Sequence, residues 1–261
     1  MKSRERWEKQ PVVGIEVFAN DVVVNRRSFS KGNGQKSKRG EIMEFSEKAR
    51  KRLAFIASNT EIEFQSMITL TYPDDYPTDG KTAKRHLYRF LAWVREQFTG
   101  VNYLWWMEFQ KRGAPHFHIL IDKQPAHNGK RWPGFQLDVA LVWNDIVKGG
   151  HDHILAGTRS ERLRSPEGAR HYCVWYAQKR GQKAVPPLYR NVGRFFGYSK
   201  PVKPEAKFTL RCDWEQLKAL LGDWDYIPDN EQDLYKVLFN TAGTVAINAV
   251  QCAMVLDYST A

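Results

Sequence analysis

The stretch Tyr103–Asp122 reads YLWWMEFQKRGAPHFHILID. Two apolar runs, Tyr103–Phe109 and His116–Ile121, flank a short basic segment, Gln110–Pro115, which contains a glycine and a proline. Apolar runs of this length, separated by turn-forming residues, predict two strands joined as a hairpin. We expect the rest of the fold to be organised around this hairpin.

Three side chains of the predicted hairpin are candidate metal ligands. His116 and His118 are two residues apart in the second strand, so both imidazoles project from the same face of the sheet. Glu108 lies near the end of the first strand and approaches the histidines if the two strands pair. Two imidazoles and one carboxylate suit a divalent ion whose remaining coordination positions are open to a substrate.

The pattern of the remaining chain predicts an α+β fold. We expect strands at residues 12–30 (a hairpin around Asn20-Asp21), Glu63–Tyr72, His153–Ala156 and Lys207–Cys212. Helices are expected at Phe45–Ala57 with Ser46 as its cap, Thr82–Phe98, Val139–Val147, Ser165–Lys183, Asp213–Leu221 and Asp233–Phe239. Strand, helix, strand, strand, helix, strand is the split βαβ order of ferredoxin-like domains. Such a sheet has one face covered by helices and one face free to carry a site.

The charge of the chain indicates a polyanionic partner. The 261 residues include 40 Lys and Arg and 29 Asp and Glu, a net charge of +11. Residues 200–261 carry 6 basic and 9 acidic residues, which leaves a net +14 on residues 1–199. A basic surface with interleaved aromatic residues suits nucleic acid, although a surface that only keeps the protein in solution accounts for the charge equally well.

Other compositional features narrow the setting. The three cysteines are far apart and in no metal-ligand spacing, which fits a reducing compartment. The N-terminus is charged throughout, and the longest apolar stretch, Ala242–Leu256, is too short for a membrane span. We therefore expect a cytoplasmic protein without a membrane partner. No Gly-Lys-Ser/Thr follows a glycine-rich loop, which argues against an ATP-driven motor.

A predicted helix supplies candidate nucleophiles. Tyr172 and Tyr176 are four residues apart in Ser165–Lys183 and can share a face, with Lys179 three residues further on. Such a tyrosine pair alone is more often core packing, but a metal site on a basic protein favours a function. A phenol has a pKa near 10 and attacks a phosphodiester only if the phosphate is polarised or the proton is removed. The product would be a 5′-phosphotyrosyl bond and a free 3′-hydroxyl.

Three motifs occur in a characteristic order between about residues 60 and 200. They are Ile68-Thr69-Leu70-Thr71-Tyr72, then Glu108 with Arg112-Gly113-Ala114-Pro115-His116-Phe117-His118, then Tyr172-x-x-x-Tyr176-x-x-Lys179. Together they resemble the HUH endonucleases, in particular the rolling-circle replication initiators of single-stranded DNA phages and small plasmids. The later stretch Gly193-Arg194-Phe195-Phe196-Gly197 also resembles the segment that follows the tyrosine motif in filamentous-phage-like initiators.

The resemblance implies a role for each motif. Glu108, His116 and His118 would hold Mn²⁺ or Mg²⁺, of which Mn²⁺ is the better compromise for imidazole and carboxylate ligands. Tyr176 would be the nucleophile, and Lys179 would add positive charge beside it. Tyr172 would be a second nucleophile or a packing residue, because Trp175 stands where the two-tyrosine pattern has a lysine. The DNA-binding residues would be Arg112, Lys183 and Arg194.

The same resemblance implies domains and partners. We expect an N-terminal hairpin, basic loop and short helix at 1–60, an HUH endonuclease domain at 61–200 and an acidic extension at 201–261. The enzyme would nick and rejoin a single-stranded DNA origin and start rolling-circle replication. Its setting would be a bacterial host cell, with a phage or plasmid as the source of the gene. A host replication helicase or polymerase is the expected protein partner.

Three alternatives remain at this stage. One is a transposase or relaxase of the same superfamily, although relaxases place the tyrosine before the histidines and small transposases are shorter. A second is a non-catalytic single-stranded DNA-binding protein that stacks bases on Trp105, Trp106 or Trp175. The third is a structural zinc site, which is disfavoured because only three ligands are evident and no cysteine is near.

Overall fold

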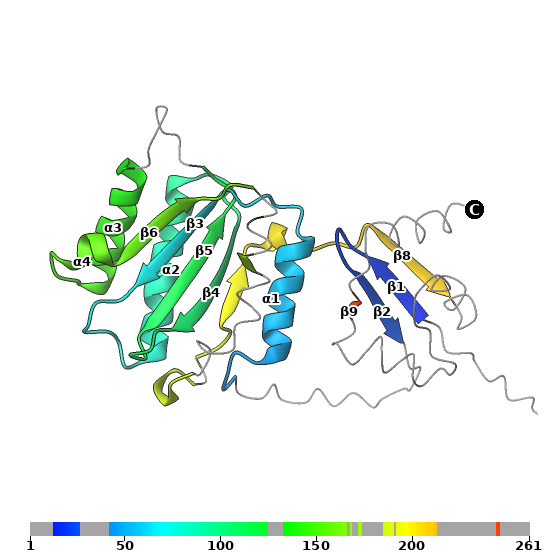
Figure 1. Ribbon diagram of the computed structural model, residues 1–261, viewed down its shortest axis with the longest axis horizontal. Coiled ribbons are helices and arrows are strands. Elements are labelled where there is room, and N and C mark those ends of the chain that lie inside the picture. Colours follow the sequence, from blue (N-terminus) through cyan, green and yellow to red (C-terminus); the bar gives the residue numbers. More distant parts are fainter. Residues whose placement is uncertain are drawn as a thin grey trace, which may run out of the picture. The chain divides into compact units, whose positions relative to one another are not determined.

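The chain divides into two units of unequal size. A computed structural model describes residues 13–26, 42–124, 133–165, 168, 172–173, 185–190, 192–212 and 244–245. Met1–Ser37 and Glu205–Ala261 form one unit, and Lys38–Pro204 forms the other (Figure 1). The three motifs all lie in the second unit. Among the described residues, no helix combines the length and the apolar character that crossing a membrane requires.

The first unit contains a four-stranded antiparallel sheet with the strand order β8-β1-β2-β9. Its strands are β1 (Val13–Val17), β2 (Val22–Arg26), β8 (Phe208–Cys212) and β9 (Thr244–Val245). The predicted hairpin around Asn20-Asp21 is confirmed, because β1 pairs with β2 and the Phe18 amide donates to the Asp21 carbonyl at 2.8 Å. The predicted strand at Lys207–Cys212 is also confirmed, as β8.

The second unit is an α+β domain built on a five-stranded antiparallel sheet with the order β6-β3-β5-β4-β7 (Figure 1). The strands are β3 (Ser66–Thr71), β4 (Tyr103–Phe109), β5 (Pro115–Ile121), β6 (Thr158–Arg162) and β7 (Phe196–Tyr198). The helices are α1 (Glu47–Asn59), α2 (Gly80–Gln97), α3 (Pro133–Val147) and α4 (His153–Ala156), with 3₁₀ turns η1 (Pro187–Tyr189) and η2 (Lys200–Val202). Strand β5 lies between β3 and β4, which is the split βαβ arrangement.

The hairpin of β4 and β5 lies at the centre of this unit. Its register pairs Glu108 with His116 and Trp106 with His118. The turn closes through a hydrogen bond from the Gly113 amide to the Gln110 carbonyl at 2.8 Å. Gly113 has a φ of +85°, a backbone conformation that favours glycine. The hairpin predicted from the opening stretch is therefore confirmed.

The two faces of the sheet differ in what covers them. Adjacent strand residues point to opposite faces, so Trp105 and Trp106 lie on different sides. Tyr88 of α2 packs edge-to-face on Trp105, and Trp143 of α3 packs edge-to-face on Phe117, with ring centroids 6.4 and 6.2 Å apart. Helices α2 and α3 therefore cover the Trp105 face. His116, His118 and Glu108 lie on the opposite face with Trp106.

Caps and buried stripes explain where the helices begin. Ser46 caps α1 by accepting from the Ala49 amide at 3.3 Å, as predicted. Asp79 caps α2 by accepting from the Lys81 amide at 3.0 Å, so α2 begins two residues before the predicted Thr82. Helix α2 buries Leu87, Phe90, Leu91 and Val94 against the sheet, which is the apolar stripe seen in the sequence.

One predicted strand is wrong. His153–Ala156 forms the short helix α4, and the strand that follows is β6, Thr158–Arg162. The His153 amide donates to the Gly150 carbonyl and the Gly157 amide donates to the His153 carbonyl, which closes one helical turn. A four-residue apolar run has too few residues for its periodicity to separate helix from strand. Strand β6 is hard to recognise because it is polar, as suits an edge strand that pairs only with β3.

Candidate active site

Strand pairing brings the three predicted metal ligands onto one face of the sheet. Glu108 on β4 lies directly across from His116 on β5, and His118 is the next residue of β5 on that face. The two imidazole ring centroids are 4.5 Å apart. The side chains of Glu108 and His118 are buried, with 2% and 4% of the residue exposed, while His116 is half-buried.

Two threonines of β3 hold the histidine rings. Thr71 pairs with His116 and Thr69 pairs with His118 in the sheet. The Thr71 Oγ1 atom lies 3.1 Å from Nδ1 of His116, and the Thr69 Oγ1 atom lies 3.3 Å from Nδ1 of His118. In the tautomer whose Nδ1–H donates to the hydroxyl, Nε2 carries the lone pair and can ligate a metal. The first sequence motif thus supports the second.

The surroundings keep the imidazole of His116 in the form that binds metals. Burial lowers the pKa of His116 to about 4, so the ring is neutral near pH 7. The indole of Trp106 stacks on the His118 ring with centroids 5.0 Å apart, which fixes the plane of that ring. Within the described part of the chain, no three His, Cys, Asp or Glu side chains form a closed ligand set as they stand. The three side chains share a face and a donor chemistry.

Tyr172 lies on the same side of the sheet as the histidines. Gly168, Tyr172 and Cys173 are helical, and Ser165 Oγ accepts from the Gly168 amide at 3.0 Å, as a helix cap does. The Tyr172 ring is 6.3 Å from the Trp106 ring, centroid to centroid. Burial raises the pKa of the Tyr172 phenol to about 12, with a further contribution from the Glu108 carboxylate. Tyr172 is therefore close enough to Glu108 for the two to interact electrostatically.

Three other predicted residues belong to the tyrosine helix. Tyr176, Lys179 and Lys183 lie outside the described residues. Their assignments as nucleophile, positive charge and DNA contact remain predictions.

Arg112 is engaged with the protein itself. Its guanidinium donates to the Tyr72 carbonyl at 2.5 Å and to the Pro73 carbonyl at 2.8 Å. It also forms a salt bridge with Asp74 at 3.0 Å and lies over the Tyr76 ring at 5.3 Å. Arg112 thus ties the turn of the β4–β5 hairpin to the chain that follows β3. A role in DNA binding remains a prediction for this residue.

Arg194 begins the segment that leads into the edge strand β7. Its side chain is exposed, and its carbonyl accepts a hydrogen bond from Nζ of Lys84 on α2. The next residue, Phe195, stacks on Phe45 with ring centroids 6.0 Å apart. This segment is thereby fastened to both α2 and the core, while the guanidinium of Arg194 remains at the surface.

The sequence analysis missed two features of the site. It quoted Thr69 and Thr71 as a motif without giving them a role, although their spacing of two matches that of the histidines. It also treated Lys84 as one of the charges of an amphipathic helix, whereas only 6% of that residue is exposed. Lys84 lies three residues before Leu87, so the helical period places it beside the buried stripe.

Comparison with known proteins gives one match. Searches of curated proteins and of solved structures find nothing that matches this chain. Residues 65–181 match the family model of the replication-associated protein ORF2, a range that contains β3, the β4–β5 hairpin and the tyrosine motif, and the match supports a protein of the replication-initiator type.

Proposed function

We propose that this protein initiates rolling-circle replication by nicking and rejoining single-stranded DNA through a 5′-phosphotyrosine intermediate. The observation that carries the proposal is the pairing of Glu108 with His116, next to His118, on the sheet face where Tyr172 also lies. The match to a replication-associated family agrees with this reading. Neither observation alone would specify the reaction.

The donor set fits a divalent ion, Mn²⁺ or Mg²⁺. Glu108, His116 and His118 would hold it, because a buried carboxylate faces an imidazole that is neutral at pH 7. The threonine hydroxyls at Nδ1 leave Nε2 of each ring as the ligating atom. When bound, the ion would stabilise the negative charge that develops on the oxygens of the scissile phosphate.

The nucleophile is a tyrosine hydroxyl. Its oxygen forms a bond to the phosphorus while the bond from phosphorus to the 3′-oxygen breaks. The phenol loses one proton and the departing 3′-oxygen gains one, so the exchange needs no nucleotide cofactor. The DNA 5′-phosphate remains on the tyrosine, and the free 3′-hydroxyl primes synthesis. Attack by a 3′-hydroxyl on the phosphotyrosine reverses the step and rejoins the strand.

Tyr176 is the better candidate for this role than Tyr172. The half-buried Tyr172 packs beside Trp106, and its pKa of about 12 holds the phenol in the protonated, weakly nucleophilic form. Tyr176 follows one helical turn later in the sequence and is followed by Lys179, whose ammonium can neutralise charge on the phosphate. Tyr172 then serves in packing or in a second transfer.

The test is a covalent adduct between the protein and single-stranded DNA. Labelled single strands that tile the origin region of the encoding replicon are incubated with Mn²⁺ or with chelator and separated under denaturing conditions. We expect an adduct only with the metal ion, and its loss in Tyr176→Phe. Tyr198→Phe, a change of the same type on the edge strand β7, should leave the adduct yield unaltered.

Two outcomes contradict the proposal at different levels. An undiminished adduct in Tyr176→Phe, with loss in Tyr172→Phe, moves the nucleophile to Tyr172 and leaves the reaction in place. A wild-type protein that binds these strands and forms no adduct with either Mn²⁺ or Mg²⁺ is a binding protein, and the proposed reaction is then wrong.

A further inference from the structure

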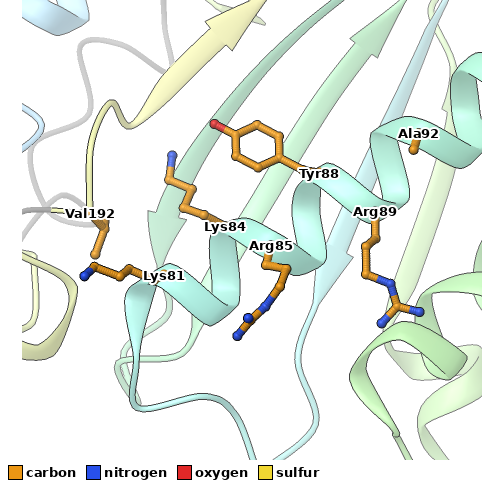
Figure 2. A pocket seen from close by; sticks show the side chains of 7 residues that line it. All are labelled: Lys81, Lys84, Arg85, Tyr88, Arg89, Ala92 and Val192. Carbon is orange, nitrogen blue, oxygen red and sulfur yellow. The ribbon is translucent and has the colours of Figure 1, made fainter.

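A basic groove runs along the solvent side of α2. It has a volume of about 460 Å³ and is open along its length. Figure 2 shows the side chains that line it, which are Lys81, Lys84, Arg85, Tyr88, Arg89, Ala92 and, from the segment before β7, Val192. Nothing in the proposed nicking reaction uses these residues.

The first row of the groove is cationic. Lys81, Arg85 and Arg89 follow one another at intervals of four residues and are exposed, so their charges line one ridge of the helix at steps of about 6 Å. Within the described residues, none of the three forms a salt bridge. A row of this kind can follow a chain of phosphates.

The acidic residues near this row are already engaged. Asp79 lies near Lys81, and its carboxylate accepts from the amides at the start of α2. Asp145 lies near Arg89 and is paired with Lys148 at 2.9 Å. The row therefore keeps an excess of positive charge.

The second row supplies an aromatic platform. Lys84, Tyr88 and Ala92 form the neighbouring ridge, and 55% of Tyr88 is exposed, which is unusual for a large ring. Tyr88 is held edge-to-face on Trp105, with centroids 6.4 Å apart, and the Lys84 ammonium lies 4.1 Å from the centre of the same indole ring. A supported ring beside a row of cations is the arrangement on which an unpaired base stacks.

The groove is separate from the candidate active site. Its platform rests on Trp105, whose side chain lies on the helix-covered face of the sheet. The histidines lie on the other face with Trp106. A ligand in the groove therefore contacts the protein on the side away from Glu108.

We propose that the α2 groove binds a second segment of single-stranded DNA, with phosphates along Lys81, Arg85 and Arg89 and a base on Tyr88. The inference rests on the proposed function for the identity of the polyanion, whereas the groove itself rests on its charges and its exposed ring. A single strand that is cut on one face of the sheet is then held at a second place on the same unit. Unpaired bases are required, because a base inside a duplex cannot reach Tyr88.

The test measures binding of the full chain to a labelled, mixed-sequence 40-nucleotide single strand in chelator, where no nicking occurs. The variant Lys81→Ala/Arg85→Ala/Arg89→Ala should bind at least about tenfold more weakly. Its plot of log affinity against log salt should be less steep by about 2, since each phosphate contact contributes about 0.7. The control Lys48→Ala/Lys51→Ala/Arg52→Ala removes three exposed basic residues of α1 and should change affinity less than about twofold. Equal losses in the two variants overturn the groove.

Tyr88 separates stacking from charge. Tyr88→Ala should weaken binding at least about fivefold, whereas Tyr88→Phe, which keeps the ring, should bind like wild type. A strand that carries bromodeoxyuridine should photo-crosslink to a peptide of α2. Absence of that crosslink, or tighter binding of an RNA or a duplex of the same sequence, overturns the assignment to single-stranded DNA.

The two proposals fail in different ways. Groove-dependent binding without an adduct refutes the nicking reaction and leaves the groove in place. A normal Mn²⁺-dependent adduct, together with binding that does not respond to the groove variants, overturns the groove alone.

Discussion

Thr71 and Thr69 lie across from His116 and His118, and each hydroxyl is within hydrogen-bond distance of the facing Nδ1. An orienting partner of this kind commonly changes metal affinity by about 10- to 100-fold when it is removed. Thr71→Val keeps the shape of the side chain and deletes the hydroxyl. We expect Mn²⁺ affinity, measured by calorimetric titration, to fall at least about tenfold in this variant.

Thr71→Ser is the matched control, because it restores the hydroxyl and loses only a methyl group. It should retain most of the affinity of the wild-type protein. Equal Mn²⁺ affinity in Thr71→Val and wild type would show that Thr71 acts only in packing. The measurement needs no DNA, so it is independent of the nicking reaction.

Lys84 gives the stability of the protein a characteristic dependence on pH. Burial lowers the pKa of its ammonium from 10.5 to about 7 in the folded protein. Between these values the unfolded chain binds the extra proton, so this residue makes the free energy of unfolding rise with pH. At pH 6 both states carry the charge, and the folded state bears the cost of burying it.

The variant Lys84→Met removes this titration. We expect the free energy of unfolding of wild type minus that of Lys84→Met to increase from pH 7 to pH 10, by at most about 1.4 kcal/mol per pH unit. Denaturant titrations followed by tryptophan fluorescence provide the measurement. A difference that stays constant over this range would mean that Lys84 keeps its proton when folded.

Residue patterns anticipated the site better than its supports. His116 and His118 were found because a spacing of two in a strand defines a face, and that rule is local. Their contacts with Thr69 and Thr71 depend on which strand lies beside β5 and in what register, which no local pattern encodes. The burial of Lys84 was hidden by its charge, although the helical period pointed to it.

At the scale of the elements, β7 tests how tightly the edge of the sheet is packed. A Cβ added at Gly197 would lie 2.8 Å from Nε1 of Trp105, inside van der Waals distance. Because the indole is itself packed by Tyr88 and Lys84, it has little room to move. Gly197→Ala should lower the free energy of unfolding by about 1–3 kcal/mol, measured by denaturant titration.

Gly134 in α3 is the control for this substitution. A Cβ at Gly134 meets nothing within 4 Å, and alanine is the better helix former. Gly134→Ala should therefore be neutral or stabilising by up to about 1 kcal/mol. Similar destabilisation in the two variants would exclude the contact with Trp105 as the cause.

Elements with a strong local signal were predictable, and those that depend on context were not. Helix α1 has a serine cap and the β4–β5 hairpin has two apolar runs around a turn, so each was found with nearly its observed bounds. Strand β6 was missed because its polar residues satisfy an edge of the sheet, and α4 was misread because its apolar run is a single helical turn. In both cases the sheet, rather than the local sequence, selects the structure.

At the scale of the whole molecule, the sequence separates what the structure joins. Strand β1 pairs along its full length with β8, which lies almost two hundred residues later in the chain. Sequence periodicity predicts that a strand exists and is silent about its partner, so this pairing could not be predicted. The split βαβ order, in contrast, followed from the sequence of elements, because short connections leave few ways to arrange them.

The connected core of the molecule lies within the second unit, which suggests that this unit folds by itself. The buried apolar cluster runs from Phe45 to Val202, and all five strands of the larger sheet belong to Lys38–Pro204. The matched range 65–181 lies inside the same unit. We expect the fragment 38–204 to unfold in one cooperative transition by calorimetry and to keep Mn²⁺-dependent adduct formation. A fragment that lacks a cooperative transition, while the full chain shows one, would mean that the sheet of β1 and β8 is required to complete the fold.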